Sequence, residues 1–516
     1  MNKKSIMEKT LQFGKFTLIS RMLGLAREVL MGRILGTTPL GIAFIAAFKL
    51  PNSLRKIFAE GALTAAFVPT FVNVLKTEGK ENANKLFSTA FVVFEGVLIL
   101  LCLFVFCCPK WVVSFSIPGE AAKTIAYAAP LLKILMSFIL FISSSALFAG
   151  ALQAKNHFFL PAFSPILFNI FFIAGIVLSW IFGYSIDFLC YMILAGGLVQ
   201  FLLHLLAYYN LGFKFGKIDE HSWKNFEKVL VKFFPVMFSM SVLEVNFFVD
   251  GRMASYYPKG IAYLYYSFRF MGIALGVVGV SFATVLLPHF SRVSMYAPKR
   301  LNFYLLESSK FIFWVIAPVV ILMSFFSEEI FATLLMSENF TYIDVLSCKV
   351  ILRAFLIGLF FFSLNKIILN VYYARHNTIS PAIISIIGAL SNILLNLLLG
   401  YYWQTVGLAL ATSLSGAITT ILLMLFLKSK YGFKMHLKSF FDFAFRYSLQ
   451  MICMFSIFFI FYFSIKHVLT FLPENINCFF TKQFGIWTWV GPLSCLLFLL
   501  LYKTKKLFKV RLYFLS

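Results

Sequence analysis

The chain has 516 residues, of which 61% are hydrophobic and only 13% are charged, and its mean hydropathy is +0.89. Soluble domains carry about 25% charged residues, so this composition excludes an ordinary soluble enzyme or binding domain. The formal net charge is +25, but the Lys and Arg residues occur mainly in short stretches between apolar runs. That distribution is typical of membrane-protein loops and argues against nucleic acid as a partner.

Apolar runs of about 20 residues recur along the whole chain, and a helix of that length crosses the hydrocarbon layer of a membrane. The sequence therefore predicts an all-α polytopic membrane protein. The first run is interrupted by Arg21 and Arg27 and lacks a small-residue cleavage site, so we expect no cleavable signal peptide. Fourteen transmembrane helices are expected, at residues 11–36, 42–75, 86–108, 123–152, 160–182, 186–210, 229–254, 260–291, 301–325, 345–374, 380–400, 405–427, 439–464 and 484–502.

Basic residues are concentrated in alternate connections between these helices, among them 76–85, 214–228 and 428–438. The opposite set is nearly uncharged, as at 36–41 and 401–405. Cytoplasmic loops carry an excess of Lys and Arg, so we expect the basic set to face the cytoplasm. With an even number of spans, both termini are then cytoplasmic.

A weak internal repeat divides the chain. A basic loop followed by Pro-Ala occurs at 154–162 and again at 374–382, and the segment 67–71 resembles 286–290, each pair being about 220 residues apart. Six spans per repeat predict two lobes of the same orientation, related by an axis along the membrane normal. We expect an N-terminal six-helix lobe at 1–215 and a C-terminal six-helix lobe at 216–430. Two additional transmembrane helices and a basic cytoplasmic tail occupy 431–516. Chance similarity among Phe- and Leu-rich segments is the alternative.

Besides Arg33 near the end of the first span, four arginines lie inside the first, second and eighth predicted spans: Arg21, Arg27, Arg55 and Arg269. Charged side chains in a span are costly and usually face a bundle interior or a watery cavity. Guanidinium groups remain charged and offer paired donors to phosphate oxygens. We therefore expect these arginines to converge in a cationic cavity that receives an anionic, phosphorylated substrate. The alternative is that Arg21 or Arg27 forms a structural ion pair with Glu28 or Glu60.

A second polar group consists of Glu244, Asn246 and Asp250 in the seventh span, Asn392 and Asn396 in the eleventh and Thr412 in the twelfth. Within this group, the four candidate ligands are Asp250, Asn392, Asn396 and Thr412. Asn392 and Asn396 share a helix face because they are four residues apart. Carboxylate, amide and hydroxyl oxygens bind small cations or relay protons, which makes this a candidate cation site. Ordinary hydrogen bonding between helices is the competing explanation.

Motifs for catalysis are missing from the sequence. The 8 cysteines form no CxxC pair, no His/Cys spacing suits a metal, and neither GxxxxGK[ST], HExxH nor GxSxG occurs. We therefore expect no enzyme activity, no catalytic residues, no metal and no cofactor. Energy would come from coupling to Na⁺ or to the membrane potential.

Three segments carry a resemblance to a known family: SRMLGLARE at 20–28, AFKLPNSLRKIFAEGA at 47–62 and AFVP at 66–69. They closely resemble the MurJ/MviN family, whose members flip lipid II, the undecaprenyl-pyrophosphate-linked peptidoglycan precursor, across the bacterial cytoplasmic membrane. The match continues more loosely through 265–288 and 407–413. The resemblance thus covers most of the chain and implies a multi-pass protein of the inner membrane that serves peptidoglycan synthesis.

The resemblance implies two six-helix lobes plus two helices, the fold of the multidrug/oligosaccharidyl-lipid/polysaccharide exporter superfamily. It also implies a central cationic cavity for the pyrophosphate and sugar headgroup, and a groove for the lipid tail formed with the last two helices. Membrane lipids and cell-wall synthesis proteins are the other partners it implies. By motif match, the substrate-binding residues of the family fall on Arg21, Arg27, Asn52, Arg55, Glu60 and Arg269.

Four positions depart from the family pattern. Ile42, Phe268 and Gly272 stand where many or some members carry acidic residues, and Asn396 stands where others have an acid in the cation site. These departures weaken coupling to sodium and leave the membrane potential as a driving force.

Other functions remain as alternatives. One is a flippase for another polyprenyl-linked oligosaccharide, and a second is a drug/cation antiporter of the same fold, although its cavity should be acidic or apolar rather than rich in arginine. A third is a non-transporting scaffold for cell-wall assembly. An enzyme acting on the lipid-linked precursor lacks a recognisable acid, nucleophile or metal group.

Overall fold

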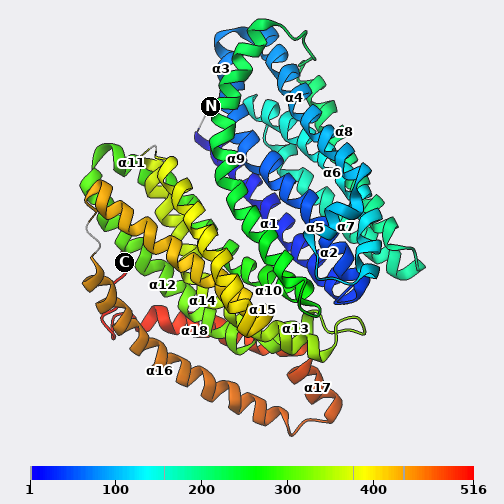
Figure 1. The fold of residues 1–516 in the computed structure, drawn as a ribbon. Helices are drawn as coiled ribbons and strands as arrows, with labels where there is room; N and C mark the ends of the chain where they lie inside the picture. The colour runs from blue at the N-terminus through cyan, green and yellow to red at the C-terminus, as the bar shows by residue number, and fades with distance from the viewer. Residues whose placement is uncertain (1–2, 156, 376, 434–435, 516) are drawn as a thin grey trace. The chain divides into compact units, whose positions relative to one another are not determined.

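The computed structural model describes residues 3–155, 157–375, 377–433 and 436–515, and helices make up most of them (Figure 1). Apart from an isolated bridge between Ser337 and Phe340, the described residues contain no β-structure. The predicted all-α class is confirmed. The α-helices are α1 (Lys3–Ile34), α2 (Pro39–Arg55), α3 (Ala62–Thr77), α4 (Gly79–Cys107), α5 (Pro109–Ser116), α6 (Ala122–Ala154), α7 (Phe159–Phe182), α8 (Ile186–Asn210), α9 (Glu220–Ala254), α10 (Gly260–Ala274), α11 (Ser281–Tyr296), α12 (Leu301–Phe325), α13 (Ser327–Leu334), α14 (Tyr342–Ala374), α15 (Ile379–Tyr431), α16 (Leu437–Leu469), α17 (Glu474–Lys482) and α18 (Trp487–Thr504).

Ten helical stretches among the described residues are long and apolar enough to cross a membrane. The chain is therefore a multi-pass membrane protein. This set leaves out three charged segments that the sequence predicts to span, namely α1, α2 with α3, and α9, and it counts α15 once. The number of fourteen transmembrane helices thus remains a prediction.

The second predicted span, 42–75, is not one regular helix. Pro51 lies inside α2, and a π-helical segment at Lys56–Gly61 separates α2 from α3. Proline removes a backbone donor, and π-segments widen a helix locally, often at functional sites. The eighth predicted span is divided in the same way, by a π-segment at Leu275–Val280 between α10 and α11.

Helix α15 contains two predicted spans joined at a sharp bend. Gln404 has φ 49° and ψ −131°, which is incompatible with a continuous helix. The two arms fold back on each other so closely that a Cβ atom at Gly407 would lie 2.0 Å from the carbonyl oxygen of Leu399. A glycine at this position therefore allows the hairpin to form.

Contacts divide the chain into two compact units, residues 1–262 and 263–516. Helix α9 belongs to the first unit because it packs against α3 and α4. The predicted lobes at 1–215 and 216–430 are inferred from the sequence repeat. The division by contacts does not test that repeat, so the lobes remain a prediction.

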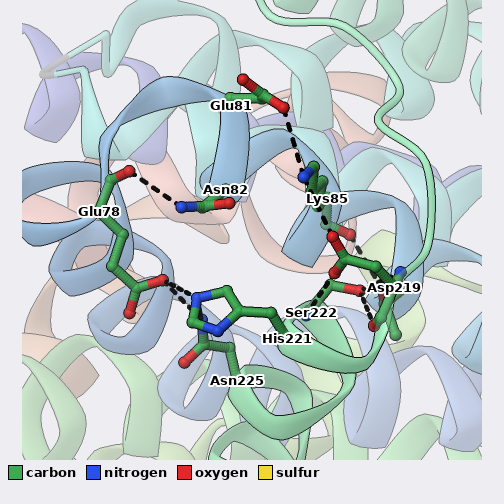
Figure 2. A network of polar contacts seen from close by, with 9 residues as sticks. Glu78, Glu81, Asn82, Lys85, Asp219, His221, Ser222 and Asn225 are labelled. Atoms are coloured by element: carbon green, nitrogen blue, oxygen red, sulfur yellow. Dashed lines mark hydrogen bonds and ion pairs between the residues drawn. The ribbon is translucent and has the colours of Figure 1, made fainter.

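A polar network holds the start of α9 against the junction of α3 and α4 (Figure 2). One carboxylate oxygen of Glu78 accepts hydrogen bonds from His221 at 2.7 Å and from Asn225 at 2.8 Å. Asp219 caps α9 by accepting from the Ser222 backbone N–H and also pairs with Lys85 at 3.0 Å. These contacts explain why α9 stays with the helices that precede it.

In the second unit, α16 and α18 pack against each other and α16 packs on α12. The Tyr447 hydroxyl donates to the Trp314 carbonyl oxygen at 2.6 Å, in an apolar cluster that includes Phe326, Phe458 and Leu497. The C-terminal segment returns to α12, where the Tyr513 backbone N–H donates to Glu307 at 3.1 Å. The two additional helices are therefore an integral part of this unit.

Candidate functional site

Arg27 occupies the centre of a polar cluster in the first unit, where α1 packs against α7. Its Nη2 atom lies 2.7 Å from Glu28 Oε1, and its Nη1 atom donates to Asn169 Oδ1 at 3.1 Å. The guanidinium group lies over the Phe172 ring, 4.8 Å from its centroid. A guanidinium group held by a carboxylate, an amide and an aromatic face has a fixed orientation. Thus Arg27 does form the structural pair with Glu28 that was the alternative expectation.

Asn169 was not singled out by the sequence. It accepts from Arg27 while its amide donates to the carbonyl oxygens of Ser20 and Pro165, at 3.2 and 3.1 Å. Asn169 therefore ties the arginine to both helices. The only sequence signal was a single amide in an apolar run, which is more often an ordinary interhelical contact.

Arg55 is the last residue of α2, and Asn52 lies one turn before it. Asn52 is buried, and its Oδ1 atom accepts from Arg55 Nε at 3.2 Å and from Nη2 at 3.0 Å. The Asn52 amide oxygen accepts hydrogen bonds from the Arg55 guanidinium group without adding a formal negative charge. The predicted pair Asn52 and Arg55 is thus brought together, at the point where the π-segment begins.

A neighbouring ion pair links the π-segment to α9. Glu244 accepts from Ser53 Oγ at 2.7 Å and from Lys56 Nζ at 2.9 Å, and Lys49 Nζ donates to the Phe248 carbonyl oxygen at 3.4 Å. Glu244 and Lys56 offset each other's charge across this interface. Sequence reasoning missed the partnership because the two sides are about 190 residues apart.

The other predicted substrate-binding residues are placed as follows. Arg21 is an exposed residue of α1, and Glu60 lies in the π-segment with its side chain outside the described part of the structure. Arg269 belongs to α10 in the second unit, with its guanidinium carbon 5.0 Å from the Tyr265 ring centroid. The convergence of Arg21, Arg27 and Arg55 with Arg269 remains a prediction.

Three of the four residues of the candidate cation site come together inside the α15 hairpin. Asn396 Nδ2 donates to Asn392 Oδ1 at 3.0 Å, and Asn392 Nδ2 lies 3.5 Å from Thr412 Oγ1. Both asparagines are buried. Asp250 belongs to the first unit, so its inclusion in the same site remains a prediction. The neutral amides bond to one another, which suits the structural explanation as well as cation binding.

An apolar groove of about 460 Å³ lies within the second unit, between α12, α14, α15 and α16. Its walls are mainly Leu, Phe, Ile and Met side chains, such as Leu306, Phe360 and Met424. Lys428 and His436 contribute polar groups to it. A groove of this composition suits a hydrocarbon chain attached to a charged headgroup.

Comparison with known proteins identifies the family. Residues 31–477 match the family described as Lipid II flippase MurJ. The probable lipid II flippase MurJ of Buchnera aphidicola from Schizaphis graminum is 30% identical over 498 residues, which cover 94% of this chain and 94% of that protein. The corresponding protein of Vibrio cholerae is 30% identical over 81% of this chain and 82% of its own length.

Solved structures agree with this relationship. A lipid II flippase MurJ in an inward closed conformation superposes with a TM-score of 0.80 at 28% identity and covers 97% of this chain and 100% of its own. An inward-facing multidrug resistance transporter of the MATE family has a TM-score of 0.69 at 13% identity over 81% of this chain and 97% of its own, and it shares the fold alone. The chain belongs to the lipid II flippase MurJ family.

Proposed function

We propose that this chain moves lipid II from the inner to the outer leaflet of the bacterial cytoplasmic membrane by alternating access. The cavity opens inward, arginines bind the pyrophosphate, and the lobes rock to expose the headgroup outside. The prenyl tail stays in lipid and follows the apolar groove of the second unit. Family membership supports the substrate.

The observation that carries the mechanism is the fixed orientation of Arg27. Its contacts with Glu28, Asn169 and Phe172 hold the guanidinium group inside a membrane segment, where an isolated charge would cost several kcal/mol. Glu28 offsets this charge, so an anionic headgroup would compete with Glu28 for the N–H donors of Arg27. Arg55 adds a second guanidinium group, which donates to the amide oxygen of Asn52.

Orientation and energy supply complete the proposal. The basic connections face the cytoplasm, and both termini lie there. Because Asn396 provides an amide where a carboxylate would bind sodium better, the membrane potential drives the cycle. A potential of 100 mV provides about 2.3 kcal/mol for each elementary charge that moves across.

The test is complementation in bacteria depleted of their own lipid II flippase. We expect the wild-type chain to restore growth, and Arg27→Ala and Arg269→Ala to fail while reaching wild-type levels in the membrane. Arg292→Ala is the matched control, because Arg292 is an exposed arginine of α11 that belongs to no predicted site. Equal rescue by all variants would contradict the arginine mechanism. Failure of the correctly inserted wild type would contradict the assignment of lipid II as the substrate.

A further inference from the structure

A second cavity, of about 200 Å³, lies within the first unit between α2, α6, α7 and α8. Arg55 borders it, and the other polar groups on its wall are neutral side chains that include Gln153, Gln200 and His204. None of the described residues that line this pocket is acidic. A ligand in the pocket would meet one fixed positive charge and several neutral hydrogen-bonding groups.

The buried ring of His204 lacks one hydrogen bond. His204 is only 1% exposed, and its Nδ1 atom lies 2.8 Å from the Gln200 carbonyl oxygen. A carbonyl oxygen only accepts, so Nδ1 carries the proton and Nε2 of the neutral ring is an acceptor. No described residue donates a hydrogen bond to this Nε2 atom. A buried acceptor without a donor costs about 1–3 kcal/mol, so a ligand with a hydroxyl or amide N–H is favoured there.

Two phenylalanines give the pocket a flat apolar wall and connect it to the arginine cluster. The Phe138 and Phe168 rings both line the pocket and stack at 5.1 Å between centroids. Phe168 also faces Arg27, whose guanidinium carbon lies 6.0 Å from the ring centroid. Phe168 therefore connects the pocket, which Arg55 borders, to the cluster around Arg27.

We infer that this pocket is a subsite for the sugar ring attached to the pyrophosphate of the substrate. Arg55 binds a phosphate oxygen, His204 Nε2 accepts from a donor on the sugar, and the phenylalanine wall covers a face of the ring. The glutamine amides are suited to further hydroxyl groups. A prenyl chain would leave the buried His204 Nε2 atom without a donor, so it belongs in the apolar groove instead. This inference rests on the proposed function.

Binding of soluble fragments tests the subsite directly. The purified full-length protein is titrated calorimetrically with N-acetylglucosamine 1-phosphate and, separately, with inorganic phosphate. The wild type should bind the sugar phosphate about tenfold more tightly than phosphate. His204→Phe keeps an aromatic ring, slightly larger than imidazole, but removes the acceptor. It should lose most of that preference while its affinity for phosphate is unchanged.

Two further variants separate the subsite from general damage to the fold. Ala149→Leu adds bulk to a residue that lines the pocket while every polar group stays in place, and it should also reduce the preference for the sugar phosphate. His289→Phe is the matched control, since His289 lies in α11 and its Nε2 atom is likewise buried without a partner among the described residues. It should bind both ligands as the wild type does.

The outcomes distinguish failure of the sugar subsite from failure of the proposed flippase function. No preference for the sugar phosphate in the wild type, no measurable binding, or an unchanged preference in both pocket variants overturns the subsite. An equal loss of sugar phosphate and phosphate binding in His204→Phe also overturns it. If the wild type still rescues flippase-depleted bacteria in these cases, the flippase function stands. If the wild type fails to rescue, the proposed function fails and the assignment of the sugar falls with it.

Discussion

The two compact units differ in the polar groups at their candidate sites, although the second unit also contains a buried ion pair, between Lys310 and Glu307. The first unit brings charged side chains into contact, as in Arg27 with Glu28 and Lys56 with Glu244. In the second unit, the α15 hairpin joins neutral groups, and Asn396 donates to Asn392. The second unit also contains an apolar groove, whereas the pocket of the first unit is bordered by Arg55 and by neutral polar side chains.

This difference indicates that the two units have different roles in substrate binding. Neutral hydrogen bonds between membrane helices contribute about 0.6 kcal/mol on average and mainly fix how helices pack. Charged groups are far more costly in a membrane and persist where function requires them. We therefore assign recognition of the charged headgroup chiefly to the first unit and accommodation of the lipid tail to the second.

The largest effect is expected from changing the guanidinium group of Arg27. Arg27→Ala should lower the initial rate of lipid II translocation in proteoliposomes by at least ~30-fold, because the fixed positive charge is lost. Arg27→Lys should retain more activity, since it keeps the charge but lacks the planar, separated donors that reach Asn169 and Glu28. If the lysine variant were as inactive as alanine, geometry rather than charge would dominate. Wild-type rates in both would remove Arg27 from the site.

A smaller effect is expected from filling the apolar groove. Met424→Trp should slow translocation of the full-length lipid by about 5–10-fold while affecting a short-tailed analogue much less, because overpacking costs about 1–3 kcal/mol. Leu414→Trp is the control, as Leu414 is an exposed residue of the same helix outside the groove. An equal effect on both lipids would show that the groove does not hold the tail.

The next prediction changes the neutral cluster of the second unit. Asn396→Asp should give the protein a sodium-dependent rise of a few degrees in Tm, measured in NaCl against choline chloride, because a carboxylate beside Asn392 and Thr412 suits a small cation. Asn370→Asp, another buried amide of this unit, should show no such dependence. No response in Asn396→Asp would favour a purely structural role for the cluster.

The smallest effect is expected from the network of Figure 2. Burial of Glu78 opposes ionisation, but hydrogen bonds from His221 and Asn225 hold its pKa below the ordinary value of 4.5. The Ser222 backbone N–H and Lys85 hold the pKa of Asp219 below its ordinary 3.8. Both carboxylates therefore stabilise the fold above these values, and this stabilisation is lost as the pH falls through the lowered pKa values.

The measurement is the Tm of the protein between pH 6 and pH 3. The double variant Glu78→Gln with Asp219→Asn should lose less Tm on acidification than the wild type does. The difference should be a few degrees at most, because the groups are largely solvated. Superimposable curves would show that this network contributes nothing to the attachment of α9.

Much of the fold was predictable because apolar runs report directly on membrane helices. The predicted span 186–210 coincides with α8, and 160–182 differs from α7 by one residue at its start. The break in the second span was only hinted at by Pro51. Short helices such as α5 and α13 carry too few residues for a periodic signal and were not predicted.

The candidate site was predictable in its residue types but not in its pairings. Arginines in apolar runs are conspicuous, and the pair Arg55 with Asn52 lies within one helical turn. The bond between Arg27 and Asn169 joins residues 142 positions apart, which no local pattern indicates. Glu244 was grouped with Asp250 because they share a span, yet the structure pairs it with Lys56 across two helices.

The most direct test of the account is lipid II translocation by the purified wild-type chain in proteoliposomes, compared with Arg27→Ala and the exposed control Arg292→Ala. The account predicts rapid transfer of the headgroup across the bilayer by the wild type and by Arg292→Ala, and near-background transfer by Arg27→Ala. Equal transfer by all three proteins would contradict headgroup recognition by the arginine cluster. No transfer by the correctly folded wild type under an imposed membrane potential would contradict the flippase proposal itself.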